Sequence, residues 1–122
     1  MSFTVLHNEK ELLGRVFRGD EKAFHDLYYH YSPRIYSNLL KLVKSGELAR
    51  ELLQQVFVSI WLRHAAIDPE KSFRSYLFAI ANNLVIDFYR KVKRDELLMD
   101  KLVAASQEAY LHTEEWLEEK ET

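Results

Sequence analysis

The chain has 122 residues, 48% of them hydrophobic, and a formal net charge of −2 at pH 7. This length accommodates one domain, or one domain with a tail, and the apolar content suffices for a sizeable core. The absence of cysteine excludes disulfides, cysteine-ligated zinc and thiol chemistry, and it fits a reducing cytosol. No apolar run approaches the roughly 18 residues needed to cross a bilayer, and no secretory signal is visible, so we expect a cytoplasmic protein without membrane insertion.

The charge is distributed unevenly along the chain. Residues 1–94 carry 15 Lys and Arg against 10 Asp and Glu, a net of +5, whereas residues 95–122 carry 2 against 9, a net of −7. Residues 71–94 alone carry six basic side chains against one acid, Asp87. Such asymmetry indicates a nucleic-acid surface beside a solvated or regulatory segment. We therefore expect a helical domain over 1–94 and an acidic linker or tail over 95–122, partly helical or disordered.

Sequence signals bound the first two helices. The first is predicted over residues 9–17, with Asn8 as its N-cap, Glu11 reaching back to that cap, and Gly19 ending the helix. The second begins after Asp20, which is placed to cap it. Only three Gly and two Pro interrupt the whole chain, and no alternation typical of strands is visible, so the fold class is all-α, a compact bundle of about four main helices.

Two helix-breaking signals occur in the middle of the chain. The first lies inside a helical pattern, and the second separates two helical patterns. Pro33, preceded by Ser32, resembles a second helix start, so we expect a kink or a short break there. The following helix ends at Ser45 and Gly46, and a third helix is predicted over 47–64. Its apolar side is wide and consists of Leu48, Leu52, Leu53, Val56, Ile60 and Trp61.

A loop over residues 65–71, marked by Asp68 before a proline, separates the third helix from a long fourth one that Ser72 is placed to cap. Seven apolar residues at helical spacing predict a buried stripe on the fourth helix: Phe73, Tyr76, Leu77, Ile80, Ala81, Leu84 and Phe88. Arginine, lysine and asparagine lie off that stripe. Exposed asparagine is a poor helix former, so its presence there indicates a role other than stabilising the helix. A helix that packs one face and offers such groups on the other is suited to nucleic acid.

Three groups of residues are similar to one known family. They are Asp20-Glu21-Lys22-Ala23-Phe24-His25-Asp26-Leu27-Tyr28; then Glu51-Leu52-Leu53-Gln54-Gln55-Val56-Phe57 with Trp61; then Phe73-Arg74-Ser75-Tyr76-Leu77, Ile80-Ala81-Asn82-Asn83 and Asp87-Phe88-Tyr89-Arg90. In this order and spacing they resemble region 2 of the extracytoplasmic-function (ECF) sigma factors of bacterial RNA polymerase. The resemblance covers about residues 9–94. It implies a transcription initiation factor domain of sigma region 2 type.

The resemblance implies a protein partner first. Region 2 of this family docks on the clamp helices of the β′ subunit of the RNA polymerase core. The matching positions on the third helix are Glu51, Leu52, Gln54 and Gln55. The family usually places an acid where this chain has Gln55, and glutamine keeps an acceptor there. An anti-sigma factor is a further partner that the resemblance implies.

The resemblance also implies that the domain binds the −10 promoter element as single-stranded DNA, on the non-template strand, with one base flipped into a pocket of the loop before the fourth helix. The positions near that pocket are Ile67, Asp68, Ser72, Phe73 and Arg74. Asn82 and Asn83 match the face that reads bases, a task that suits their paired donor and acceptor atoms. The phosphate-holding positions are Arg90, Lys91, Lys93 and Arg94.

Family members normally carry a second helical domain that reads the −35 element. This sequence ends at Thr122, inside what should be the linker, as an excised fragment or as a short natural variant. We therefore expect the chain not to recognise a complete promoter by itself. The acidic tail admits two interpretations, a linker remnant or a segment that folds back on the basic helix and weakens DNA binding.

Other function classes remain open to different degrees. We find no nucleophile with a base and an orienting partner, no glycine-rich phosphate loop and no Glu-x-x-His pair, so we expect no enzyme, no cofactor and no metal. Most of the aromatic stripe is expected to be core, and only Phe73 and Tyr89 are candidates for base stacking.

The main alternative is a helical interaction module that binds polymerase or an anti-sigma factor without reading DNA. A further alternative is a regulator that binds duplex DNA.

Overall fold

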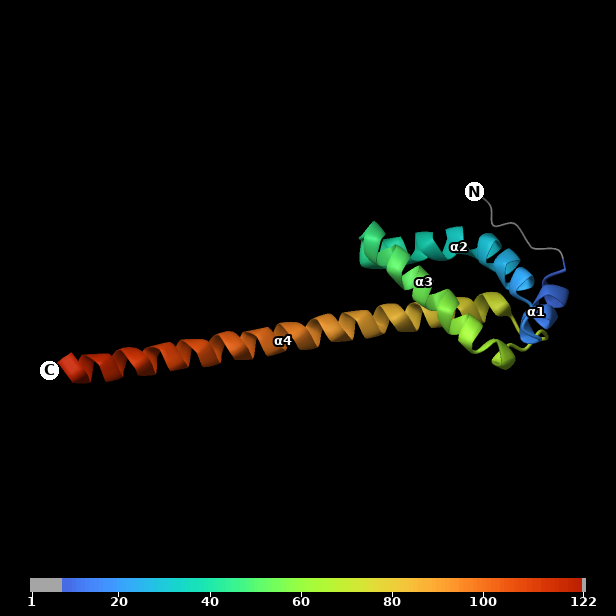
Figure 1. Cartoon of the computed structure of the whole chain (residues 1–122). Coiled ribbons are helices and arrows are strands. Elements are labelled where there is room, and N and C mark those ends of the chain that lie inside the picture. Colours follow the sequence, from blue (N-terminus) through green and yellow to red (C-terminus); the bar gives the residue numbers. More distant parts are fainter. Residues whose placement is uncertain (1–7, 122) are drawn as a thin grey trace. The chain divides into compact units, whose positions relative to one another are not determined.

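A computed structural model describes residues 8–121 of the chain, and the side chains of residues 8–108. Within this range the backbone forms helices and connecting turns, so the predicted all-α class is confirmed. The elements are α1 (Glu9–Phe17), α2 (Glu21–Val43), α3 (Gly46–Leu62), the short 3₁₀ turn η1 (His64–Ala66) and α4 (Phe73–Glu121) (Figure 1). The chain divides into two compact units, Met1–Ile86 and Asp87–Thr122. None of the helices in the described range combines the length and the apolar character that crossing a membrane requires.

The start of α1 differs from the prediction. Asn8 occupies the N-cap position, but its backbone is left-handed (φ 65°) and its side chain makes no capping hydrogen bond. An N-cap side chain reaches the free N–H groups of the first turn when its own backbone is extended. The predicted capping by Asn8 is therefore wrong. The end of α1 agrees with the sequence, because Gly19 has φ +88° just beyond it.

Asp20 caps α2 as predicted. One of its carboxylate oxygens accepts hydrogen bonds from the backbone N–H groups of Lys22 (3.0 Å) and Ala23 (3.2 Å). The other accepts from Nε of Arg15 at 2.8 Å, which ties α1 to the start of α2. The Ala23 N–H and the Arg15 guanidinium favour the charged carboxylate and hold the pKa of Asp20 below its usual value.

The predicted break at Pro33 does not occur, because α2 continues from Glu21 to Val43 with the proline inside it. Proline has no N–H, so the helix forgoes one backbone hydrogen bond at this point. The ribbon of α2 bends partway along its length (Figure 1). The alternative of a short break at Pro33 is therefore wrong.

A two-residue connection joins α2 to α3. Lys44 is left-handed (φ 55°), and its N–H donates to the carbonyl of Leu40 (2.9 Å). Ser45 is then extended, and its Oγ accepts from the N–H of Leu48 (3.3 Å), so Ser45 is the N-cap of α3. Ser45, predicted as the end of the preceding helix, instead caps the helix that follows. At its other end, α3 stops at Leu62, before the predicted His64, which lies in η1.

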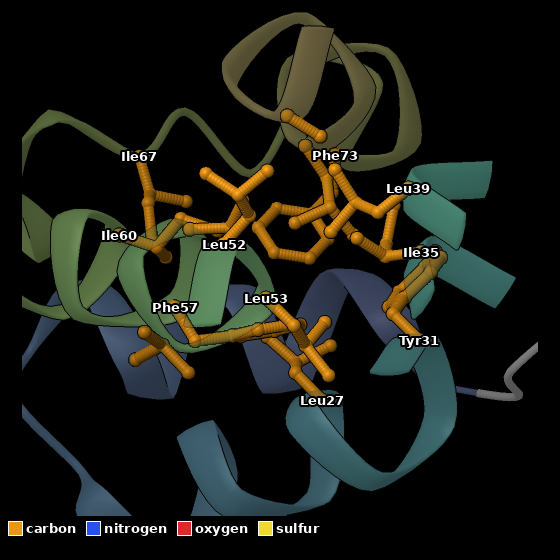
Figure 2. Packing of buried hydrophobic residues seen from close by; sticks show 14 of the residues in the cluster. Leu27, Tyr31, Ile35, Leu39, Leu52, Leu53, Phe57, Ile60, Ile67 and Phe73 are labelled. Carbon is orange, nitrogen blue, oxygen red and sulfur yellow. The ribbon is translucent and has the colours of Figure 1, made fainter. Parts of the chain in front are cut away.

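Apolar side chains from α2, α3 and the start of α4 meet in a single core (Figure 2). Phe73 projects from the first turn of α4 among side chains of α2 and α3. The buried residues of α2 and α3 are Ala23, Leu27, Tyr31, Ile35, Leu39, Ala49, Leu52, Leu53, Val56, Phe57 and Ile60. α1 adds Leu13 and Val16, and the loop adds Ile67.

The buried stripe of α4 is narrower than predicted. Its fully buried members recur every four residues, at Phe73, Leu77, Ala81 and Val85. Val85 was not predicted, and it takes the place expected for Leu84. The remaining predicted members, Tyr76, Ile80, Leu84 and Phe88, are only half buried. Ser72 caps the helix as expected, since its Oγ accepts from the N–H of Ser75 (3.2 Å).

The acidic segment after Arg94 is helical. α4 continues through it to Glu121. The prediction for this part allowed either helix or disorder, and the structure has helix. Side chains beyond Glu108 and the last residue, Thr122, lie outside the described residues.

One buried polar contact links α1 to α2. The phenol of Tyr31, in the core, donates a hydrogen bond to the carboxylate of Glu9 in the first turn of α1. Burial of the ring, followed by the neighbouring Glu9 carboxylate, raises the pKa of Tyr31 well above its usual value. The ionised phenolate is therefore disfavoured in the folded chain.

We expect Leu77→Ala to destabilise the fold by about 2–5 kcal/mol, because it leaves a cavity where α4 meets the core. Leu77 is 0% exposed, whereas Ile86 on the same helix is 47% exposed. Ile86→Ala, the matched control, should cost less than half as much. Urea unfolding followed by circular dichroism measures both changes, and equal costs for the two variants would contradict this account of the core.

Tyr31 should make stability fall at high pH. Its folded-state pKa lies above the unfolded value of about 10, so its contribution is present below that pH and is lost as pH rises further. Tyr31→Phe should lower the free energy of unfolding by about 1–2 kcal/mol at neutral pH, because a hydrogen bond is lost. It should also reduce the loss of stability at alkaline pH. Urea midpoints from about pH 8 to about pH 11 measure this. The control is Tyr29→Phe, since Tyr29 is exposed on the same helix, and an alkaline slope unchanged by Tyr31→Phe would refute the assignment.

Candidate functional site

The exposed side of α3 carries a shallow hollow of about 480 Å³. Predicted residues Glu51, Gln54 and Gln55 line it together, which their spacing of three and four along a helix explains. Four more residues complete the lining: Val58, Ser59, Leu62 and Arg63. The exposed Val58 and Leu62 extend the same row toward the C-terminal end of α3. The result is an apolar strip bordered by a carboxylate and two amides.

Leu52 was predicted for the same surface, but its side chain lies on the other side of α3. It is 4% exposed and belongs to the core (Figure 2). Its direct contact with a partner is therefore ruled out in this conformation, and its role is to hold the helix. Val58 and Leu62 were missed, although their positions seven and eleven residues after Glu51 put them on the same face.

Aromatic rings fix the orientation of α3 on α2. Phe24 contacts Trp61 with ring centroids 5.1 Å apart, and Tyr28 meets Phe57 edge to face at 4.8 Å. Such pairs add to the stabilisation from burial alone. The exposed face of α3 is therefore carried by a rigid pair of helices.

The loop between α3 and α4 is held by polar contacts at several points. The ring of His64 lies with Nδ1 3.1 Å from the carbonyl of Phe17, at the end of α1. Asp68 accepts from the N–H of Glu70 (2.9 Å), which closes a local turn. Lys10 of α1 forms an exposed ion pair with Glu70 at 2.7 Å. These contacts give the loop one shape although it has little regular structure of its own.

A second hollow, of about 510 Å³, lies where this loop meets the start of α4. Buried Ile67 and Phe73 line it, together with half-buried Tyr76. The exposed members of the lining are Ala66, Asp68, Lys71, Ser72 and Ser75. An apolar and aromatic wall beside hydroxyls, a carboxylate and an ammonium group can accept a flat polar ring such as a nucleobase.

The structure brings four of the five predicted pocket residues into this lining, namely Ile67, Asp68, Ser72 and Phe73. Arg74 does not line it, and its guanidinium lies 5.7 Å from the centroid of the Phe78 ring. Phe73 was a candidate for stacking on a base, but its ring is 3% exposed and packs on Tyr31 at 5.3 Å. That expectation is corrected, because a ring held in the core offers no open face.

Tyr76, which was predicted only as a core residue, also lines this hollow. It lies four residues after Ser72, so it follows the cap by one turn and faces the same hollow. Its half-buried ring combines packing with access to the hollow. The proximity of an aromatic residue to the cap, one turn into the helix, was the signal available in the sequence.

Asn82 and Asn83 are exposed on α4, off the buried stripe, as predicted. They do not line the hollow at the loop. Arg90, Lys91, Lys93 and Arg94 belong to the second unit and are all exposed. Arg90 pairs with Asp87, with 3.9 Å between the guanidinium and the carboxylate. Exposed pairs of this kind contribute little to stability, so these cations stay available to a partner.

Comparison with known proteins assigns the chain to a family. Residues 27–95 match the Sigma-70 region 2 family. The ECF RNA polymerase sigma factor SigW of Bacillus subtilis is 30% identical over 89 residues, which cover 73% of this chain and 48% of SigW. The ECF RNA polymerase sigma factor RpoE of Cereibacter sphaeroides is 33% identical over 78 residues, 63% of this chain and 43% of RpoE. The chain thus spans about half the length of these relatives.

A solved structure is similar as well. It is the NMR structure of the complex formed by an engineered region 2 of sigmaE in complex with GTAAAA. The likeness has a TM-score of 0.65 and a sequence identity of 26%, and it covers 77% of this chain and 96% of the other. Family model, relatives and solved structure agree, and the chain belongs to the sigma-70 region 2 family, of the ECF type.

Proposed function

We propose that this chain is a transcription initiation factor domain that binds the RNA polymerase core and holds the −10 promoter element as single-stranded DNA. In this proposal residues 1–94 are the binding domain and residues 95–122 are a linker. The chemistry is binding and needs no covalent step. The observation that carries the proposal is the hollow beside Tyr76, at the loop where the family captures a base, on a chain similar to a region 2 in complex with GTAAAA.

The strand would be held by three kinds of contact. A flipped base enters the hollow lined by Ile67, Asp68, Ser72 and Tyr76, at a cost of a few kcal/mol for unstacking that stacking and hydrogen bonds offset. Asn82 and Asn83 read neighbouring bases through paired donors and acceptors. Arg90, Lys91, Lys93 and Arg94 bind phosphate and add affinity without sequence information.

The polymerase would bind the exposed face of α3. There Glu51, Gln54 and Gln55 stand beside exposed Val58 and Leu62, an apolar strip with a polar border. This composition is typical of the centre and rim of protein interfaces. The β′ clamp helices are the surface that the family assigns to it, and an anti-sigma factor would compete for the same region.

The base hollow predicts a defined loss of DNA affinity. Tyr76→Ala should weaken binding of a short labelled single strand containing GTAAAA by at least about tenfold, because one stacked base is lost. Tyr76→Phe should retain most of the affinity, since it keeps the ring. Fluorescence anisotropy at fixed salt measures both, with Tyr29→Ala as a control that removes an exposed tyrosine elsewhere.

Two results would argue against this use of the hollow. One is that the Tyr76→Ala and Tyr29→Ala variants, both correctly folded, bind the single strand with equal affinity. The other is binding of the duplex form of the same sequence as tightly as the single strand, which would favour a regulator of duplex DNA.

A single strand of shuffled sequence tests the role of Asn82 and Asn83. Changing both residues to alanine should reduce the preference of the chain for the GTAAAA strand over the shuffled strand.

The α3 face predicts polymerase capture. Wild-type chain should retain bacterial core polymerase in a pull-down, and the double variant Glu51→Arg, Gln54→Ala should lose most of it, because a charge is reversed at the border of the strip. Glu21→Arg on α2 reverses an exposed charge outside the hollow and serves as the control. Capture by the double variant at wild-type level would exclude this face. Capture without any DNA affinity would indicate the interaction module instead.

A further inference from the structure

Arg74 and Phe78 form a cation–π pair on α4. The guanidinium carbon of Arg74 lies 5.7 Å from the centroid of the Phe78 ring, within the range of such contacts. Arg74 is exposed, and Phe78 is half buried against the core. The ring is therefore held by the fold, and it positions a guanidinium group that solvent and ligands can reach.

Asn82 continues this pair along the helix. Arg74, Phe78 and Asn82 follow one another at intervals of four residues, the spacing that places side chains on one side of a helix. Asn82 is exposed, and it lies about 6 Å beyond Phe78 along the axis, at about 1.5 Å per residue. We call Arg74, Phe78 and Asn82 the stacking row. All three belong to the first unit, as do the residues of the hollow beside Tyr76.

The stacking row is a surface separate from that hollow. None of its three members lines the hollow. Tyr76 is two residues from both Arg74 and Phe78, which turns it about 200° away from them around the helix. Exposed Ser75 lies between the two surfaces, because it lines the hollow and precedes Phe78 by three residues. A base held by Tyr76 and a base held by the stacking row are therefore two different bases.

The chemistry of the row fits an unpaired adenine. Nucleobases stack on arginine guanidinium groups as well as on aromatic rings. The amide of Asn82 offers an acceptor and two donors, the set that pairs with N6 and N7 of adenine. A phosphate contact, by comparison, needs a cation and does not require a ring beside it. The combination of guanidinium, ring and amide thus indicates a base rather than a phosphate.

We propose that Arg74, Phe78 and Asn82 form a second base-binding subsite, which holds one unpaired adenine by stacking on Arg74 and by hydrogen bonds to Asn82. The proposal rests on the proposed function, because this adenine belongs to the same single strand whose flipped base enters the hollow beside Tyr76. The strand passes Ser75 between the two subsites. Arg74, which does not reach the hollow, then has a base of its own.

Removal of one base at a time from the labelled GTAAAA strand tests this subsite. For the wild-type chain, an abasic site should weaken binding at least about fivefold at one position held by the stacking row and at another held by Tyr76. In Arg74→Gln, and in Phe78→Leu, which keeps an apolar side chain at the half-buried position, the first loss should fall below about twofold and the second should persist. In Tyr76→Ala the second loss should disappear and the first persist.

Two further variants separate stacking from charge. Arg74→Lys keeps the charge but lacks the planar guanidinium, so it should bind as weakly as Arg74→Gln. Asn82→Ala should lose the preference for adenine over thymine at the position held by the row. The controls are Arg50→Gln on α3 and Phe17→Leu on α1, exposed residues of the same types outside both subsites, and they should bind like the wild type. Circular dichroism checks that every variant keeps its helices.

Three results would overturn the second subsite. They are full affinity of Arg74→Lys, equal weakening by Arg74→Gln whichever base is missing, and dependence of Tyr76 and the stacking row on the same position. Loss of position dependence for Tyr76 alone would contradict the proposed role of the hollow and leave the second subsite standing. A folded wild type that binds no single strand would overturn both.

Discussion

The position of the Phe73 ring determines much of the first unit. This side chain enters the core from the first turn of α4, and its ring meets Tyr31 of α2 at 5.3 Å. Tyr31 in turn donates a hydrogen bond to Glu9 of α1. One series of contacts thus connects α4 to α2 and α2 to α1. Because Phe73 directly follows the loop, its burial also determines where the loop ends and where the hollow opens.

Each helix that carries a candidate surface also carries the core on its other side. On α3, Leu52 and Val56 are buried while Glu51 and Gln55 face solvent, only one position away in the sequence. On α4, Ala81 is buried and Asn82 is exposed next to it. A rigid helix pair and an anchored loop can therefore present chemically different surfaces with little reorganisation on binding, which lowers the entropic cost of association.

The sequence was informative where the pattern is periodic or local. Helix spacing identified the buried sides of α3 and α4, and the capping roles of Asp20 and Ser72 followed from their positions. The family resemblance placed Leu52 and Phe73 among the functional positions, but it could not separate a residue that touches a partner from one that supports it. That separation depends on which way the helix faces once it is packed, a property of the whole bundle.

The misjudged boundaries have local physical reasons. Asn8 is a good capping residue in an unsuitable backbone conformation, and Ser45 serves the helix that follows it rather than the one before. The change of charge at Arg94 does not coincide with the end of α4, which continues to Glu121. No glycine or proline follows Pro69, so nothing in the backbone interrupts the helix there.

The two-residue connection at Lys44 and Ser45 also bears on how the chain reaches its fold. It makes α2 and α3 neighbours along the chain as well as in space, so the contacts nearest the connection close short loops, and such contacts form early and fast. Phe73 must instead return across the loop to reach the finished pair of helices. We expect the α2–α3 hairpin to be the folding nucleus and the docking of α4 to be the later step. The same order makes the loop and its hollow the last part of the unit to fold and the first to open, while the α2–α3 pair stays intact.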